Sequence, residues 1–154
     1  MRHTALLLLT LILTALTASA QATLSISFPD ASKAGFSAPG AGYWESRNTA
    51  EPMKGIAAGY SSSLFTVQGG FDLESKRNGF VLAGPKVIDI TARFGDSLSV
   101  IMPLYALVGV TEFKTGLFDW GAATGLHLKW RRFGIGTQVN MTKYTRTISL
   151  SIHI

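Results

Sequence analysis

The chain of 154 residues contains no cysteine. This absence excludes disulfide frameworks, thiolate nucleophiles and cysteine-based metal sites together. Because no covalent cross-link is available, the folded state must be stabilised by packing, by hydrogen bonds or by a lipid environment.

Charged residues are also scarce: they make up 15% of the chain, and the formal net charge is +5. The basic residues form no run longer than the pairs Lys76-Arg77 and Arg131-Arg132. A nucleic-acid-binding surface needs a denser basic patch than this. We therefore expect no nucleic-acid partner.

The first 22 residues, MRHTALLLLTLILTALTASAQA, have the three parts of a secretory signal peptide. Arg2 gives a basic start, an apolar run extends from Ala5 to about Leu16, and small residues follow at Ala18-Ser19-Ala20. The apolar part is shorter than the roughly 20 residues of a membrane-spanning helix, so a membrane anchor is the weaker alternative. We predict a cleaved signal peptide over residues 1–22 and export of the remaining chain.

Residues 23–41 are expected to form an N-terminal extension. The segment begins with a short alternating piece, Leu24 to Phe28, and then becomes rich in Pro, Gly, Ala and Ser. This composition leaves three outcomes open: an added strand, a plug or a loose tail. We place the folded domain at residues 42–154.

Helical periodicity is nearly absent after the signal peptide, because apolar residues recur at every second position instead of every third or fourth. The pattern predicts an all-β domain with eight strands. The expected strands are 42–47, 54–61, 64–75, 80–94, 97–111, 118–131, 132–141 and 146–154.

The longest apolar stretch, Leu98 to Val110, has 13 residues, which is too short for a membrane helix and suits a strand. Proline lacks an N–H group, so we expect a bulge or local irregularity at Pro103 and at Pro85. A bulge at Pro85 turns Lys86 to the same face as the polar residues. In a regular strand, Lys86 would lie on the apolar face.

The alternation alone does not decide which face lies inside. A soluble barrel buries its apolar face, whereas a membrane barrel turns that face to lipid. The other face here is rich in Gly, Ser, Thr, Asn and Gln and poor in Lys and Glu, which suits a narrow lumen filled by side chains. The sequence favours a membrane barrel, and a soluble periplasmic barrel that binds a lipid-like ligand is the alternative.

Turns and aromatic residues agree with this interpretation. Tight turns at 62–63, 95–96 and 131–132 share one end, here named the lower end, and slightly longer connections share the upper end. Trp120 and Trp130 lie ten residues apart on one face, which is roughly 25 Å along a tilted barrel strand. Aromatic girdles are typical of both membrane interfaces. The expected lower girdle is Tyr60, Phe65, Phe94, Trp130 and Phe133, and the expected upper girdle is Phe71, Phe80, Trp120 and Tyr144.

These features resemble the small eight-stranded outer-membrane barrels of Gram-negative bacteria, of the opacity-protein and outer membrane protein A transmembrane-domain type. The resemblance is carried by the signal peptide, by GAATGLHLKWRRFGIGTQVN and by the last strand, RTISLSIHI. It implies a closed antiparallel up-and-down transmembrane β-barrel, contact with outer-membrane lipids and insertion by the barrel assembly machinery. Ile154 departs from the aromatic residue that commonly ends such barrels.

Two groups of side chains are candidate sites. Asp89, Arg93, His127 and Lys129 share the expected lumen face and are interpreted as a structural ionic cluster, with proton transfer as the less favoured alternative. The expected upper end carries cations that suit lipopolysaccharide phosphates, and acidic residues that explain the same cations by ion pairing. The cations are Arg47, Lys54, Lys76, Arg77, Lys114, Lys143 and Arg146, and the acidic residues are Glu45, Glu51, Asp72, Glu74, Glu112 and Asp119.

The third function class is a lipid A-modifying barrel enzyme. Deacylases of that class resemble one another in a His-x-Ser-Asn motif, but neither His127 nor His153 has a serine two positions later. The chain also lacks a serine nucleophile elbow and a His/Asp cluster at metal-ligand spacing. We expect a non-conducting, porin-like barrel with a structural or interaction role, without enzymatic activity, metal or cofactor.

Overall fold

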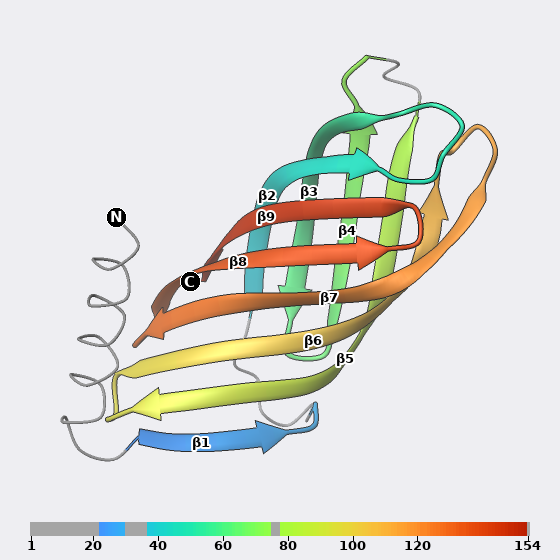
Figure 1. Cartoon of the computed structure of the whole chain (residues 1–154). Coiled ribbons are helices and arrows are strands. Elements are labelled where there is room, and N and C mark those ends of the chain that lie inside the picture. The colour runs from blue at the N-terminus through green and yellow to red at the C-terminus, as the bar shows by residue number, and fades with distance from the viewer. Residues whose placement is uncertain (1–21, 30–36, 75–77, 154) are drawn as a thin grey trace, which may run out of the picture.

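The computed structural model describes residues 22–29, 37–74 and 78–153, which form nine β-strands (Figure 1). None of these residues belongs to a helix long and apolar enough to cross a membrane. The strands are β1 (Ala22–Ser27), β2 (Ser37–Ser46), β3 (Lys54–Ser62), β4 (Phe65–Asp72), β5 (Gly79–Phe94), β6 (Leu98–Thr111), β7 (Leu117–Trp130), β8 (Phe133–Thr142) and β9 (Thr145–His153).

Strands β2 to β9 form a closed antiparallel barrel. Each strand pairs with its neighbours in the sequence, β5 pairs with β6, and β2 pairs with β9 to complete the ring. Closure gives both edges of the eight-stranded sheet a partner for their backbone groups. The prediction of an all-β, closed, eight-stranded, up-and-down barrel is confirmed.

The connections fall at two ends as predicted. The lower end carries the tight turns β3–β4, β5–β6 and β7–β8, and the upper end carries the other four connections. Two upper connections are joined to neighbouring elements, because Arg47 N–H donates to the Tyr144 carbonyl (2.6 Å) and Lys143 N–H donates to the Trp120 carbonyl (3.0 Å).

Strand β2 begins at Ser37, five residues before the start predicted for the first barrel strand. The small residues of β2 allow its backbone to lie close to that of β9, since a Cβ on Gly42 would lie 2.0 Å from the Ile148 carbonyl oxygen. The Ser-Ala-Pro-Gly-Ala composition looks like a loop in sequence, but pairing with β3 and β9 overrides that local preference.

Strand β1 lies outside the ring of eight and pairs with the lower half of β5, as Figure 1 shows. Strand β4 pairs only with the upper half of β5, from Gly79 to Pro85. Strand β1 therefore pairs along the same edge of β5 below β4, from Asp89 to Phe94. Of the outcomes left open for the N-terminal segment, residues 22–27 add a strand.

The expected bulge near Pro85 is present, just beyond it at Val87. The β5–β6 register shifts between Lys86 and Ile88. Lys86 consequently points inward and is buried. At Pro103 the irregularity is a gap and not a bulge: Met102 and Pro103 have no register partner on β7, while the β6–β7 register is the same on both sides, from Ile101↔His127 to Leu104↔Thr124.

The bulge position overturns one girdle assignment. Because the bulge follows Lys86, residues before it with the same alternation, including Phe80, also point inward. Phe80 is fully buried and meets Trp44 edge-on, with ring centroids 4.9 Å apart. The upper half of the lumen thus has an apolar core that the sequence did not predict: Trp44, Met53, Ala57, Phe80, Leu82, Tyr105, Leu107 and Ala123.

Candidate functional site: the outer face and the lumen

The outer face of the barrel is strongly apolar. Trp120 is 60% exposed, Trp130 61% and Leu150 68%. These positions alternate with buried ones along β7 and β9, so each strand presents large apolar side chains outward. Further exposed apolar residues of the barrel are Ile56, Phe71, Val81, Val108, Phe133, Ile135, Met141 and Ile148.

Glycine makes room for the buried Trp44 beneath this shell. A Cβ on Gly70 would lie 2.7 Å from the Trp44 ring, and a Cβ on Gly55 would lie 2.8 Å from its Nε1. The indole N–H donates to the Phe71 carbonyl at 3.2 Å. The largest side chain of the lumen is thus packed and hydrogen-bonded in place.

Asp119 organises the upper lumen. Its Oδ2 accepts hydrogen bonds from the hydroxyls of Thr111 (2.7 Å), Thr142 (2.6 Å) and Thr145 (2.8 Å). Its Oδ1 accepts the backbone N–H of Tyr144 at 3.0 Å. The side chain is fully buried, and these bonds satisfy a charge that would otherwise be costly to bury. Asp119 lies near the upper end as predicted, but it is buried in the lumen and binds threonine hydroxyls instead of surface cations.

Five polar side chains form a belt across the middle of the lumen, named here the cross-lumen belt: Ser61, Thr66, Gln68, Gln138 and Asn140. The Ser61 hydroxyl donates to Gln138 Oε1 (2.7 Å) and lies 2.8 Å from the Thr66 hydroxyl. Gln138 Nε2 donates to Asn140 Oδ1 (3.3 Å), and Asn140 Nδ2 donates to Gln68 Oε1. Strands β3 and β4 are separated from β8 in the ring by β2 and β9, so these bonds cross the interior.

The belt leaves little free space. The cavity beside it, lined by residues such as Gly59, Gln68 and Gln138, has a volume of about 10 Å³. Such a volume holds no more than about one water molecule. The described lumen is therefore closed at this level by its own side chains.

The lower lumen contains two polar pairs. Lys86 Nζ lies 2.6 Å from Asp89 Oδ2. His127 Nδ1 and His153 Nε2 are 2.8 Å apart, and their rings meet at 87°. Gly136 makes the second pair possible, because a Cβ there would lie 2.1 Å from His127 Nδ1.

The predicted lumen cluster is thus arranged differently from the expectation. His127 is buried on the expected face, but it binds His153, and Asp89 binds Lys86. Arg93 is exposed, and Lys129 is partly exposed at the lower end. The sequence-based cluster did not include Lys86 and His153. Both were nevertheless expected on this face: Lys86 because of the bulge, and His153 because it alternates with the apolar residues of the last strand.

The predicted girdle residues occupy different heights at the lower end. Phe65 pairs with Pro85, halfway along β5, and its ring lies 6.2 Å from that of Tyr60. Phe94 lies at the far end of β5, level through the register with Trp130 and Phe133. Phe94 and Tyr144 are half-buried and Phe80 is buried, whereas the remaining members of the girdle prediction (Tyr60, Phe65, Phe71, Trp120, Trp130 and Phe133) are exposed.

Two of the upper-end cations that the structure describes form ion pairs with described residues. Arg146 Nη1 lies 3.4 Å from Glu45 Oε1, and Lys54 Nζ lies 4.0 Å from Glu74 Oε1. The Lys54–Glu74 pair is largely exposed and the Arg146–Glu45 pair is partly exposed, so solvent screens both and each contributes little to stability. Ion pairing thus accounts for these two cations.

The other upper-end cations have different surroundings. Lys143 Nζ lies 4.8 Å from the ring centre of Tyr144, Lys114 is exposed in the β6–β7 connection, and Arg47 is half-buried. Lys76 and Arg77 lie outside the described residues.

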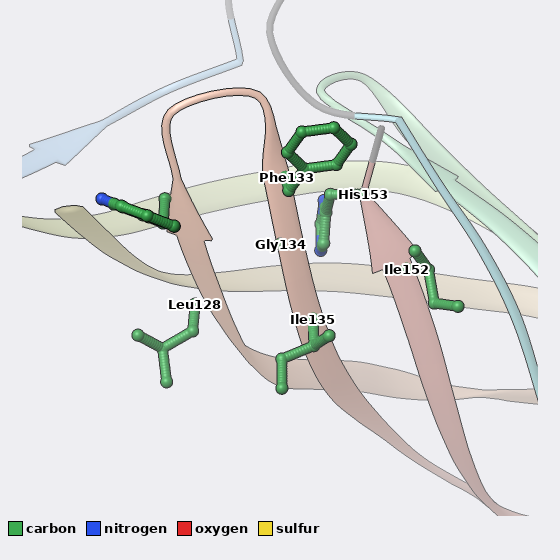
Figure 2. Close-up of a pocket in the computed structure, with 7 residues that line it drawn as sticks. Leu128, Phe133, Gly134, Ile135, Ile152 and His153 are labelled. Carbon is green, nitrogen blue, oxygen red and sulfur yellow. The ribbon is translucent and has the colours of Figure 1, made fainter. Parts of the chain in front are cut away.

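An apolar groove runs along the outer face of β7, β8 and β9 and was not anticipated from the sequence. Two adjoining hollows of about 430 and 390 Å³ share Leu128, Ile135 and Ile152. Figure 2 shows these three side chains on neighbouring strands, with Phe133 near the turn. We call this the outer groove; it extends from Leu126 and Leu150 to Trp130 and Phe133.

Comparison of the chain with protein-family models, with curated proteins and with solved structures finds no match.

Proposed function

We propose that this chain is a small, non-conducting β-barrel of the Gram-negative outer membrane with a structural or interaction role. Within that class, its architecture fits the opacity-protein and outer membrane protein A transmembrane-domain type. The proposal includes export by a cleaved signal peptide and insertion by the barrel assembly machinery.

The observation that carries the proposal is the arrangement of the two faces. Soluble monomers seldom expose contiguous apolar patches larger than a few hundred Å², yet here the exposed face of each barrel strand carries large apolar side chains. The polar side chains, including Asp119, Gln138 and His127, are inside. Lipid stabilises this arrangement, whereas water would destabilise it by leaving the apolar face hydrated.

The filled lumen supports the non-conducting part of the proposal. The cross-lumen belt, the Asp119 site and the apolar core at Trp44 and Phe80 occupy successive parts of the interior. A carrier of a lipid-like ligand needs a large apolar cavity, and the described cavity beside the belt holds only about 10 Å³. The soluble-carrier alternative therefore has no room for its ligand at that level.

Contact with lipopolysaccharide is proposed for the upper-end cations that have no carboxylate partner among the described residues. Lys114 and Lys143 are exposed there, and exposed cations at a membrane surface bind lipid phosphates. Arg146 and Lys54 already face carboxylates, so we propose that they contribute less to lipopolysaccharide binding.

Membrane extraction together with gel migration tests the proposal. The full chain should remain in the membrane fraction after a high-salt wash, and the folded barrel should migrate differently in unheated and boiled samples. Release in aqueous buffer with a single unchanging band would refute the membrane barrel and favour the soluble carrier.

Two further measurements separate the finer alternatives. Reconstituted protein should give no conductance steps in a planar bilayer, because the cross-lumen belt blocks the lumen. Mass spectrometry of lipid A from cells with and without the gene should show unchanged acylation; altered acylation would identify a lipid-modifying enzyme instead.

A further inference from the structure

The outer groove has the dimensions of a chain-like ligand. It follows β7 from Leu126 to Trp130, which is roughly 13 Å of extended strand. Its walls are the outward side chains of Leu128, Ile135 and Ile152, together with neighbouring apolar residues. A second protein copy needs a broader contact, of about 1,000 Å² or more, so a narrow apolar hollow suits an acyl chain better.

Two arginines lie at the lower end of this groove. Arg131 and Arg132 form the whole turn between Trp130 and Phe133, and both are exposed. The Arg131 guanidinium carbon lies 5.7 Å from the centre of the Trp130 ring, which itself lines the groove. The cation and the apolar hollow are therefore adjacent.

The arginine turn is fixed in position and lacks a carboxylate partner within the described residues. Arg131 has a φ of 55°, and its N–H donates to the Ser97 carbonyl at 2.9 Å. Neither arginine forms an ion pair with a described residue, including Asp96 in the neighbouring turn. Their charges are thus available to an external anion.

We propose that the outer groove and the arginine turn together bind one anionic phospholipid. Arg131 and Arg132 bind the phosphate of the headgroup, and one acyl chain lies in the groove against Leu128, Ile135 and Ile152. This inference rests on the proposed function, because the groove meets lipid only if the barrel spans a membrane. It assigns a lipid site to the lower end, opposite the end where lipopolysaccharide contact is proposed.

Fluorescence quenching by brominated lipids tests the site. The W120F variant keeps Trp130 as its exterior tryptophan, and W120F/W130F gives the background from the buried Trp44. The barrel is reconstituted in phosphatidylcholine vesicles that contain a minor fraction of either dibrominated phosphatidylglycerol or dibrominated phosphatidylcholine. The two probes have the same acyl chains, so only the headgroup differs.

Trp130 is expected to be quenched more by the brominated phosphatidylglycerol. An interfacial arginine contributes about 1 kcal/mol toward an anionic lipid, which corresponds to about a fivefold preference for each arginine. The R131Q/R132Q substitutions should reduce that preference by at least about fivefold. The matched control, K114Q/K143Q, removes two cations from the upper end and should leave quenching of Trp130 unchanged.

A second measurement remains informative even where the turn variant folds poorly. Native mass spectrometry of the barrel released from phosphatidylglycerol-containing vesicles should detect one retained phosphatidylglycerol. The substitution Ile152→Phe fills the groove from the exposed surface and should abolish that retention without changing the arginines.

The outcomes distinguish the inference from the proposed function. Equal quenching by both brominated lipids, unaffected by R131Q/R132Q, would keep the membrane barrel and overturn the lipid site. A lipid-free dimer that I152F dissociates would also overturn it, by assigning the groove to a second copy. Absence of quenching by either lipid would refute the membrane barrel itself.

Discussion

Truncation of Asp119 to alanine tests how the lumen is held together. The carboxylate accepts three threonine hydroxyls and one backbone N–H, and each such bond contributes roughly 1.5 to 3 kcal/mol. The four contributions do not add, because the Thr111 and Thr145 hydroxyls already lie 2.7 Å apart and the Thr142 hydroxyl also reaches the Thr145 carbonyl. We expect Asp119→Ala to lower the free energy of unfolding by about 3 to 4 kcal/mol.

The assay is urea unfolding of the barrel in detergent micelles, followed by tryptophan fluorescence. The matched control is Glu51→Ala, which removes one carboxylate from an exposed position at the same end and should change the unfolding free energy by less than about 0.5 kcal/mol. Unfolding of Asp119→Ala at the wild-type urea concentration would refute the assignment of Asp119 as the organiser of the upper lumen.

Two further predictions concern the lower lumen. Lys86→Met should destabilise the barrel by about 3 kcal/mol, because it leaves Asp89 with neither carboxylate oxygen bound to a described partner. The double variant Lys86→Met/Asp89→Asn should lose less unfolding free energy than Lys86→Met alone. A larger loss for the double variant in urea unfolding would contradict the pairing. Gly136→Ala should cost roughly 1 to 3 kcal/mol because its Cβ meets the buried ring of His127. Gly69→Ala is the control, because the nearest atom to its Cβ lies at 3.4 Å, and equal unfolding free energies for the two variants would argue against that steric conflict.

Strict alternation made most of the barrel predictable. In β7, β8 and β9, most residues at every second position are large and apolar, so the strands, their faces and the two-residue turn at 131–132 follow from the sequence alone. The inward position of Lys86 was also predictable, because a lysine side chain that faces lipid is energetically costly.

The remaining features depend on tertiary contacts. The position of the bulge after Lys86, instead of before it, decided that Phe80 packs on Trp44 inside the barrel. Strand β2 contains a loop-like composition that only the close contact with β9 makes suitable for a strand. Asp119 lies near the upper end as predicted, but its alternation with the outward Trp120 turns it into the lumen, where only the fold brings Thr111, Thr142 and Thr145 to it.

The pairing of side chains inside the lumen was the least predictable feature. Partners such as Gln138 and Ser61 are far apart in sequence, and the register around the ring determines which inward residues meet. A one-residue shift of one strand would change every such pair. The sequence therefore predicts which residues face the lumen but not which of them bind one another.

The central claim, that the apolar face meets lipid, is tested most directly by the three tryptophans. Trp44 is buried in the lumen, whereas Trp120 and Trp130 are exposed on the outer face. In vesicles of brominated lipid, the wild-type fluorescence should be strongly quenched, and the residual fluorescence of W120F/W130F, which comes from Trp44, should be nearly unaffected. Equal fractional quenching of the two proteins, or no quenching of the wild type, would contradict the account.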